Sequence, residues 1–372
     1  MMKANPLLQL KAHGQSVWLD FIQRSLIESG ELKRLIDQDG LSGLTSNPTI
    51  FAKAISETNE YDEEIERLLK VCNTTEEIYL SLAVRDIQEV ADLFYSTFER
   101  TKGQDGFVSL EVSPHLAHDT QRTIEEARKL FGLVNRKNLM VKIPATREGL
   151  PAIEQAISEG ININVTLIFS LERYEQVAQA YLSGLEKRTK KGEPLDPVHS
   201  VASVFVSRID TKTDKLLAKK GIQALQGKVA VANSKLIYQK FKEILAGKRF
   251  KALEGKGANV QRPLWGSTGT KNPSYSDVLY IEELIGANTV NTVPPSTLQA
   301  FRHHGKVRPS LEEGVSEARK VIKELSEAGI DLKQLTDELE TEGVKSFRDS
   351  FDQLLYSIQE KQEKIQASAG GA

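Results

Sequence analysis

Lys142 is the residue whose position most clearly suggests chemistry. It lies in "LMVKIPAT", a run that otherwise has the composition of a buried β-strand. Removing an unpaired ammonium from water is costly, so a buried lysine either contacts a partner or gives up its proton. A deprotonated lysine amine can attack a carbonyl carbon and form an imine. The alternative is that the Lys142 side chain reaches solvent from the end of the strand.

Other polar side chains share the strand face of Lys142. Alternate residues of a strand point to opposite faces, and in "VSLEV" the three aliphatic residues share one face while Ser109 and Glu111 share the other. The same alternation predicts an inward-facing set that consists of Asp20, Asn47, Glu111, Lys142, Asn164, Thr166 and Ser203. Two carboxylates, an amine, amides and hydroxyls in one cavity are suited to catalysis. A structural polar network is the alternative.

Eight β-like runs alternate with helical patterns and must position these side chains. The runs span residues 17–21, 43–47, 108–112, 139–144, 162–169, 201–207, 263–268 and 289–293. Among the helical patterns, 81–100 carries an apolar stripe, 170–185 begins at the N-cap residue Ser170, and 229–247 ends at Gly247. This order predicts an α/β fold, a closed (β/α)8 barrel of the TIM type, whose active sites lie at the carboxyl ends of the strands. An open doubly wound sheet would give a similar order.

The remaining segments fit one barrel domain over residues 1–372. Past Gly329 we expect two helices within a helical extension over 330–366, followed by a flexible tail over 367–372. A chain of this length could also form two domains, but no linker that would separate a second domain occurs.

Composition and charge argue against several classes of partner. The 49 basic and 51 acidic residues give a net charge of −2, so nothing points to nucleic acid or a membrane, and an anionic ligand needs a local site. The single cysteine, Cys72, cannot form an internal disulfide, and no signal segment or long apolar run occurs, which indicates a reducing, cytoplasmic setting. The six histidines show no metal-ligand spacing, so we expect no metal and no other cofactor.

Five motifs together resemble those of one family. They are "GLTSNPTIF", "VSLEVSP", "LMVKIPAT", "NVTLIFS" and "SVFVSR". In this order, from about Asp20 to Val293, they are similar to the motifs of transaldolases, in the class I Schiff-base aldolase superfamily. The resemblance implies a Schiff base on Lys142, an acid–base role for Asp20, water handling by Glu111 with Thr166, binding of substrate hydroxyls by Asn47, Asn164 and Ser203, a pocket wall at Phe205 and phosphate binding by Arg208.

One segment departs from the pattern of many family members. Where they carry a second phosphate-binding arginine, this chain has "GSTGTKNP", with Lys271 in its place. The segment resembles the longer-chain subgroup with "STxTKNP". A lysine supplies the charge but not the bidentate fork of arginine. The alternative is a solvated loop lysine.

The activity that the resemblance implies is the transfer of a dihydroxyacetone unit in the pentose phosphate pathway. The donor would be a ketose phosphate, either sedoheptulose 7-phosphate or fructose 6-phosphate, and the acceptor either glyceraldehyde 3-phosphate or erythrose 4-phosphate. Two alternatives remain open: a lyase like fructose-6-phosphate aldolase, and a non-catalytic barrel that binds sugar phosphates. In each case the partners are sugar phosphates, and the protein is expected as a monomer or homodimer.

Overall fold

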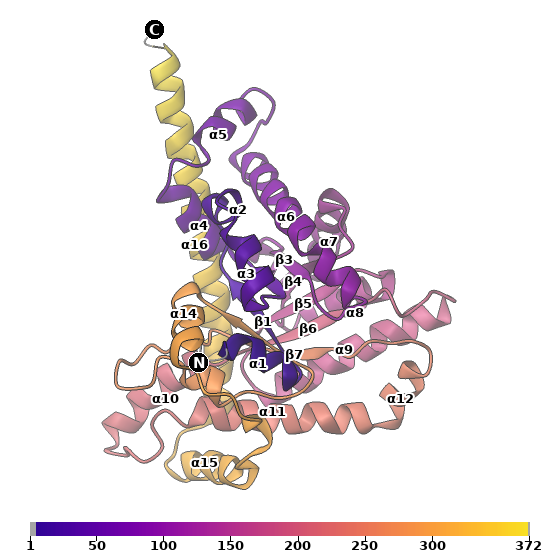
Figure 1. Cartoon of the computed structure of the whole chain (residues 1–372), viewed down its shortest axis with the longest axis vertical. Coiled ribbons are helices and arrows are strands. Elements are labelled where there is room, and N and C mark those ends of the chain that lie inside the picture. The colour runs from indigo at the N-terminus through magenta and orange to yellow at the C-terminus, as the bar shows by residue number, and fades with distance from the viewer. Residues whose placement is uncertain (1–4, 371–372) are drawn as a thin grey trace.

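Eight parallel strands form a closed barrel in chain order. The computed structural model describes residues 5–370, with side chains to residue 367. The strands are β1 (Gln15–Asp20), β2 (Gly43–Thr45), β3 (Phe107–Glu111), β4 (Leu139–Pro144), β5 (Ile163–Ile168), β6 (Ser200–Phe205), β7 (Arg262–Gly266) and β8 (Thr289–Val293). Pairing of β8 with β1, for example Val293 with Leu19, closes the sheet. The predicted barrel is therefore confirmed over an open sheet, and each predicted run overlaps one strand (Figure 1).

Helices surround this barrel. They are α1 (Pro6–Ala12), α2 (Arg24–Glu28), α3 (Glu31–Asp39), α4 (Pro48–Ser56), α5 (Asp62–Leu68), α6 (Thr75–Arg100), α7 (Thr120–Val134), α8 (Gly149–Glu159), α9 (Leu171–Lys190), α10 (Ser207–Lys219), α11 (Val229–Ala246), α12 (Lys248–Glu254), α13 (Leu279–Glu282), α14 (Pro295–His304), α15 (Val315–Glu327) and α16 (Leu332–Gly370), with short 3-10 helices η1 (Pro114–Leu116) and η2 (Ser310–Glu312). Within the described part of the chain, none of them is long and apolar enough to cross a membrane.

The ends of three helices test the sequence signals. Helix α6 begins earlier than predicted, because Thr74 and Glu77 form a capping box in front of it. The side chain of Ser170 accepts a hydrogen bond from the backbone of Arg173 and caps α9 as predicted. Helix α11 ends directly before Gly247, also as predicted.

The strand side chains separate into two apolar clusters. Outward-facing residues such as Val17, Leu110 and Val141 belong to the large core that includes the surrounding helices. The inward-facing cluster consists of Trp18, Phe107, Met140, Val201, Leu264 and Val290. Its members come from the first or middle positions of their strands. They fill the barrel interior towards the amino-terminal ends of the strands, so the polar inward residues lie nearer the carboxyl ends.

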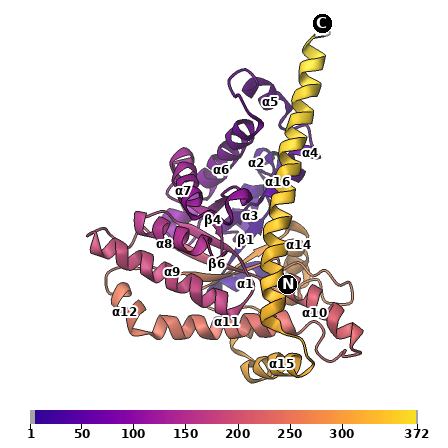
Figure 2. The same cartoon turned by 180° about the vertical axis from the view of Figure 1, so that it is seen from behind.

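The C-terminal region forms one helix where the sequence predicts two. Helix α16 runs from Leu332 to Gly370 and extends past α4 and α5 (Figures 1 and 2). A glycine inside a helix costs about 1 kcal/mol relative to alanine. At Gly343 the absence of a side chain allows close packing that offsets this cost. A Cβ there would lie 3.0 Å from Cδ2 of Leu167. Of the predicted tail, α16 includes the backbone to residue 370, and residues 371–372 lie outside the described residues.

Candidate active site

A cavity of 150 Å³ lies at the carboxyl ends of the strands. Its walls include the predicted residues Asp20, Asn47, Lys142, Ser203, Phe205, Arg208 and Lys271. Two more predicted residues interact with residues of these walls. Glu111 forms an ion pair with Lys142, and Asn164 accepts a hydrogen bond from Ser203. Thr166 lies two residues after Asn164 on β5 and is fully buried. Strand alternation therefore brings together residues from β1, β3, β4, β5 and β6.

Lys142 is buried and has a charged partner. Lys142 and Glu111 are register neighbours on β4 and β3, and their side chains are each 5% exposed. The Lys142 Nζ lies 3.1 Å from Glu111 Oε2 and donates a hydrogen bond of 3.2 Å to the backbone oxygen of Ser46. The side chain thus points into the barrel, and the alternative in which it reaches solvent is wrong.

Burial raises the pKa of both carboxylates in the site. It raises the pKa of Glu111 above the usual range, although the nearby Lys142 ammonium partly offsets this effect. Burial likewise raises the pKa of Asp20, against the opposing charges of Lys142, Arg208 and Lys271. Asp20 Oδ1 accepts a hydrogen bond of 2.8 Å from Thr45, which also contacts Thr292. Two carboxylates with raised pKa values can exchange protons closer to neutral pH than ordinary ones.

A chain of hydrogen bonds fixes the amide of Asn164. Its Nδ2 donates to Ser109 Oγ at 3.0 Å, and its Oδ1 accepts from Ser203 Oγ at 2.6 Å. Farther along β5 the register with β6 shifts, and Leu167 has a φ of 61°. Such bulges re-aim side chains beside functional sites. The Thr166 hydroxyl next to it is buried without a hydrogen-bond partner among the described residues.

Two cations that line the cavity have no close carboxylate partner. Among the described residues, neither the Arg208 nor the Lys271 side chain forms an ion pair within 4.0 Å or a hydrogen bond. The Arg208 guanidinium lies 5.2 Å from the ring centre of Phe205, and burial lowers the pKa of Arg208. Lys271 lines the same cavity but is exposed. Cations available in this way can hold an anionic group of a ligand.

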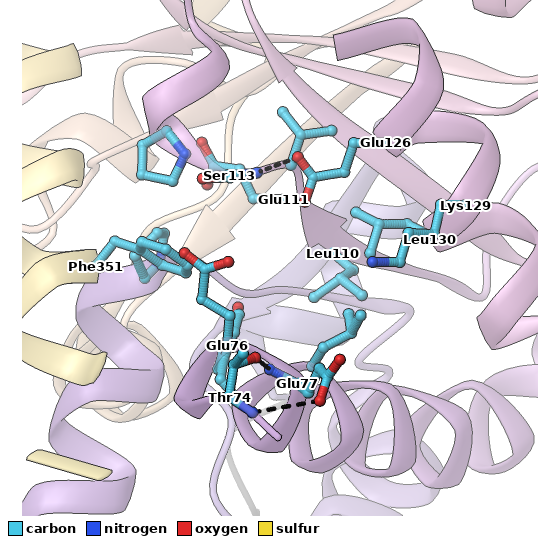
Figure 3. A pocket seen from close by; sticks show the side chains of 15 residues that line it. Thr74, Glu76, Glu77, Leu110, Glu111, Ser113, Glu126, Lys129, Leu130 and Phe351 are labelled. Atoms are coloured by element: carbon cyan, nitrogen blue, oxygen red, sulfur yellow. Dashed lines mark hydrogen bonds between the residues drawn. The ribbon is translucent and has the colours of Figure 1, made fainter. Parts of the chain in front are cut away.

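A second, larger cavity is lined by Glu111 together with residues of α6, α7 and α16. Its volume is 250 Å³, and Figure 3 shows Ser113 and Glu126 on one side with Thr74, Glu76 and Glu77 on the other. Glu126 accepts a hydrogen bond from the backbone of Ser113, and burial raises the pKa of Glu126. Acidic residues outnumber basic ones along its lining, where Lys129 is the basic residue. Charge therefore favours the smaller cavity, which is lined by Lys142, Arg208 and Lys271, over the larger one for an anionic ligand.

Comparison with known proteins identifies the family. The family model described as Transaldolase/Fructose-6-phosphate aldolase matches residues 17–358. The chain belongs to this family. A protein named transaldolase from Saccharopolyspora erythraea is 50% identical over 94% of this chain and 95% of its own length. A transaldolase from Trichodesmium erythraeum is 46% identical over 98% and 99%, and transaldolase 2 from Nostoc punctiforme 46% identical over 97% and 98%.

The sequence alone assigns no role to four residues of this transaldolase-family site. Ser109 is placed on the face of Glu111 but is not in the predicted set, and strand alternation puts Thr45 and Thr292 on the inward face as well. All three bond or flank the predicted residues. Phe347 of α16 lines the cavity, with its ring centre 5.5 Å from Lys142 Nζ. No local pattern marks Phe347, since its position depends on how α16 packs across the barrel.

Proposed function

We propose that the chain transfers a dihydroxyacetone unit from a ketose phosphate to an aldose phosphate through a Schiff base on Lys142. Transaldolase activity, EC 2.2.1.2, follows from the family and its full-length relatives. The proposal adds the roles of the residues. One observation carries it: Lys142 is buried against Glu111 in a cavity that also holds Asp20 and two cations without a close carboxylate partner.

Imine formation would begin at the Lys142–Glu111 pair. Glu111, 3.1 Å away, takes a proton from the Lys142 ammonium, and the free amine attacks the ketone carbon of the donor. Glu111 then returns the proton to the hydroxyl that forms, which leaves as water. Thr166 supports this exchange, because its buried hydroxyl is not committed to another described residue. General acid–base help of this kind contributes about 10²–10⁴-fold in rate.

Carbon–carbon cleavage would follow at Asp20. Its carboxylate removes the proton from the hydroxyl two carbons from the imine carbon, and the bond between the two intervening carbons breaks. The electron pair moves into the protonated imine, an aldose phosphate leaves, and an enamine of dihydroxyacetone stays on Lys142. Reversal with a second aldose phosphate completes the transfer. The hydrogen bond from Thr45 keeps Asp20 in place.

The remaining residues would bind and orient the sugar phosphates. The Asn47 Oδ1 caps α4 by accepting from Ile50 at 3.0 Å, which leaves its amide donors for a substrate hydroxyl. Asn164 and Ser203 hold each other in place for the same task. Arg208 and Lys271 bind the phosphate, and Phe205 forms an apolar wall. This division between hydroxyl-binding and phosphate-binding residues fits either of two donors, fructose 6-phosphate or sedoheptulose 7-phosphate. It also fits either of two acceptors, erythrose 4-phosphate or glyceraldehyde 3-phosphate.

Borohydride trapping tests the proposal directly. Borohydride reduces an imine to a stable amine, so fructose 6-phosphate with borohydride should inactivate the protein and label the peptide that contains Lys142. Lys142→Arg keeps the positive charge but cannot attack a carbonyl, and it should lose both label and turnover. Label on another lysine, or full turnover in Lys142→Arg, would disprove the Schiff base at this position.

Dependence on the acceptor separates transfer from release. With fructose 6-phosphate alone a transferase should form little free dihydroxyacetone, whereas added erythrose 4-phosphate should yield sedoheptulose 7-phosphate. A lyase would release dihydroxyacetone equally in both reactions, and a binding protein would consume no donor.

A further inference from the structure

Phe347 places an aromatic wall from α16 against both charged ends of the catalytic cavity. Its ring centre lies 5.5 Å from Lys142 Nζ and 5.9 Å from the Arg208 guanidinium carbon. The ring also meets Phe205 at 6.4 Å between centres, and the residue is only 4% exposed. Phe347 therefore occupies space where water would otherwise reach the Lys142 amine.

Anchors on both sides hold this wall in place. Lys212 of α10 bonds Glu338 and Glu342 of α16, each at 2.7 Å. On the far side of Phe347, Thr49 of α4 bonds Ser350 at 2.8 Å. One turn before Phe347, the lack of a side chain at Gly343 lets α16 approach the strained residue Leu167 of β5. These contacts hold the part of α16 that carries Phe347 against the barrel.

We propose that Phe347 determines how the enamine on Lys142 divides between transfer to an acceptor and release as free dihydroxyacetone. The inference rests on the proposed Schiff-base function. It assigns a specificity role to a residue of α16, outside the strands that carry the catalytic groups.

The two fates of the enamine differ in their first step. In transfer, the enamine carbon attacks the aldehyde carbon of the acceptor and the new hydroxyl takes up a proton. In release, the enamine carbon takes a proton instead. In both fates water then adds to the imine carbon, and the Lys142 amine leaves with formation of the ketose phosphate or of dihydroxyacetone. A ring that excludes water from the enamine slows proton delivery to its carbon, which slows the second fate and leaves attack on the aldehyde open.

The ring also acts through its charge distribution. The face of an aromatic ring attracts a cation, more strongly where water is excluded. Phe347 can therefore stabilise the protonated imine without supplying a proton or a nucleophile. The same ring faces Arg208, so a phosphorylated acceptor held by Arg208 would enter beside it.

The test measures both products from the same enamine. Phe347→Ala, given fructose 6-phosphate and erythrose 4-phosphate, should raise the ratio of free dihydroxyacetone to sedoheptulose 7-phosphate by about tenfold, because water admitted beside the enamine can deliver a proton to its carbon. Phe347→Leu, which keeps more of the apolar volume, should give a smaller rise. Because both products come from folded protein, the ratio does not depend on how much of a variant folds.

Phe351→Ala is the matched control. Phe351 lies one turn later on the same helix, and its ring packs on Tyr79 at 5.3 Å and on His115 at 5.9 Å, away from the cavity of Lys142. We expect the product ratio of this variant to equal that of the unmodified protein. An unchanged ratio in both Phe347 variants, or an equal rise in Phe351→Ala, would overturn the proposal. Absence of borohydride label on Lys142 in the unmodified protein would instead remove the Schiff base on which it rests.

Discussion

The two ends of the barrel each contain a buried ion pair, and the pairs differ in how completely they are bonded. At the amino-terminal end, Arg262 and Asp105 lie 3.3 Å apart. Ser16 Oγ accepts from Arg262 at 2.8 Å and donates to Asp105 at 2.7 Å, while Trp18 Nε1 donates to Asp105 at 3.1 Å. A further bond joins Arg262 to the backbone oxygen of Gln104. These charges are enclosed by fixed partners, as a structural network requires.

The pair at the carboxyl end is left incomplete. Lys142 has Glu111 and one backbone oxygen as partners. Glu111 Oε2 has no hydrogen bond of good geometry among the described residues, and neither has the Thr166 hydroxyl. Leaving such groups unsatisfied costs stability, and this end opens to a cavity whereas the other is sealed by the cluster around Trp18. The difference shows that burial of charge marks a reactive site only where bonding capacity remains for a ligand.

The largest expected effect is a loss of catalysis at the carboxyl end of the barrel. Asp20→Asn keeps the shape and the contact with Thr45 but loses the base, so kcat should fall by about 10²–10⁴-fold. Borohydride should still label Lys142, because imine formation precedes the step that Asp20 performs. Near-native turnover in this variant would remove Asp20 from the mechanism.

Removing the ion pair between Arg262 and Asp105 should lower stability rather than catalysis. Arg262→Ala leaves Asp105 as a buried, uncompensated charge, and the free energy of unfolding should fall by about 3–5 kcal/mol. Denaturant titration measures this loss, and kcat per folded molecule should stay within about twofold of the unmodified value. A large fall in kcat at full folding would show that the two ends are coupled.

The cations of the open end should separate binding from chemistry. Arg208→Ala removes a charged contact that is remote from the reacting bond, so KM for fructose 6-phosphate should rise by about 30-fold, the size of a lost charge-assisted hydrogen bond. Lys271→Ala should raise KM less, because Lys271 is exposed. Steady-state kinetics with unphosphorylated dihydroxyacetone as donor provides the control, and equal effects on both donors would place these residues outside the phosphate site.

The smallest expected effect is a change in the pH dependence of stability. Because the pKa of Asp20 is raised in the folded protein, its contribution to stability is present at low pH and is lost as pH rises through the folded pKa. Asp20→Asn should therefore gain stability relative to the unmodified protein as the pH is raised from acid towards neutral. Asp105→Asn, which breaks a complete set of bonds, should lose stability at neutral pH. Parallel curves for the unmodified protein and Asp20→Asn would contradict the raised pKa.

The comparison also shows which parts of the site were predictable. Strand alternation is local, so the inward positions of Asp20, Lys142 and Ser203 followed from the sequence once the strands were recognised. The pairing of Lys142 with Glu111 needed the register between β3 and β4, which a single strand does not contain.

The position of α16 could not be predicted from local patterns. The sequence predicts two helices past Gly329, yet the absent side chain of Gly343 lets one continuous helix pack on Leu167. Phe347 reached the cavity only through that packing. Tertiary contacts decided both points, as they often override local preference.

The place of α16 in the chain has a consequence for biosynthesis. The last barrel strand ends at Val293, and Phe347 follows 54 residues later (347 − 293). At a synthesis rate of about 5–20 residues per second, the ribosome completes all eight strands roughly 3–11 s before it adds Phe347. Lys142, Asp20 and Glu111 can thus meet in a growing chain before their wall exists. The nascent barrel should therefore pass through a brief period in which its site is open to solvent. This period ends when α16 has been translated and packs on the barrel.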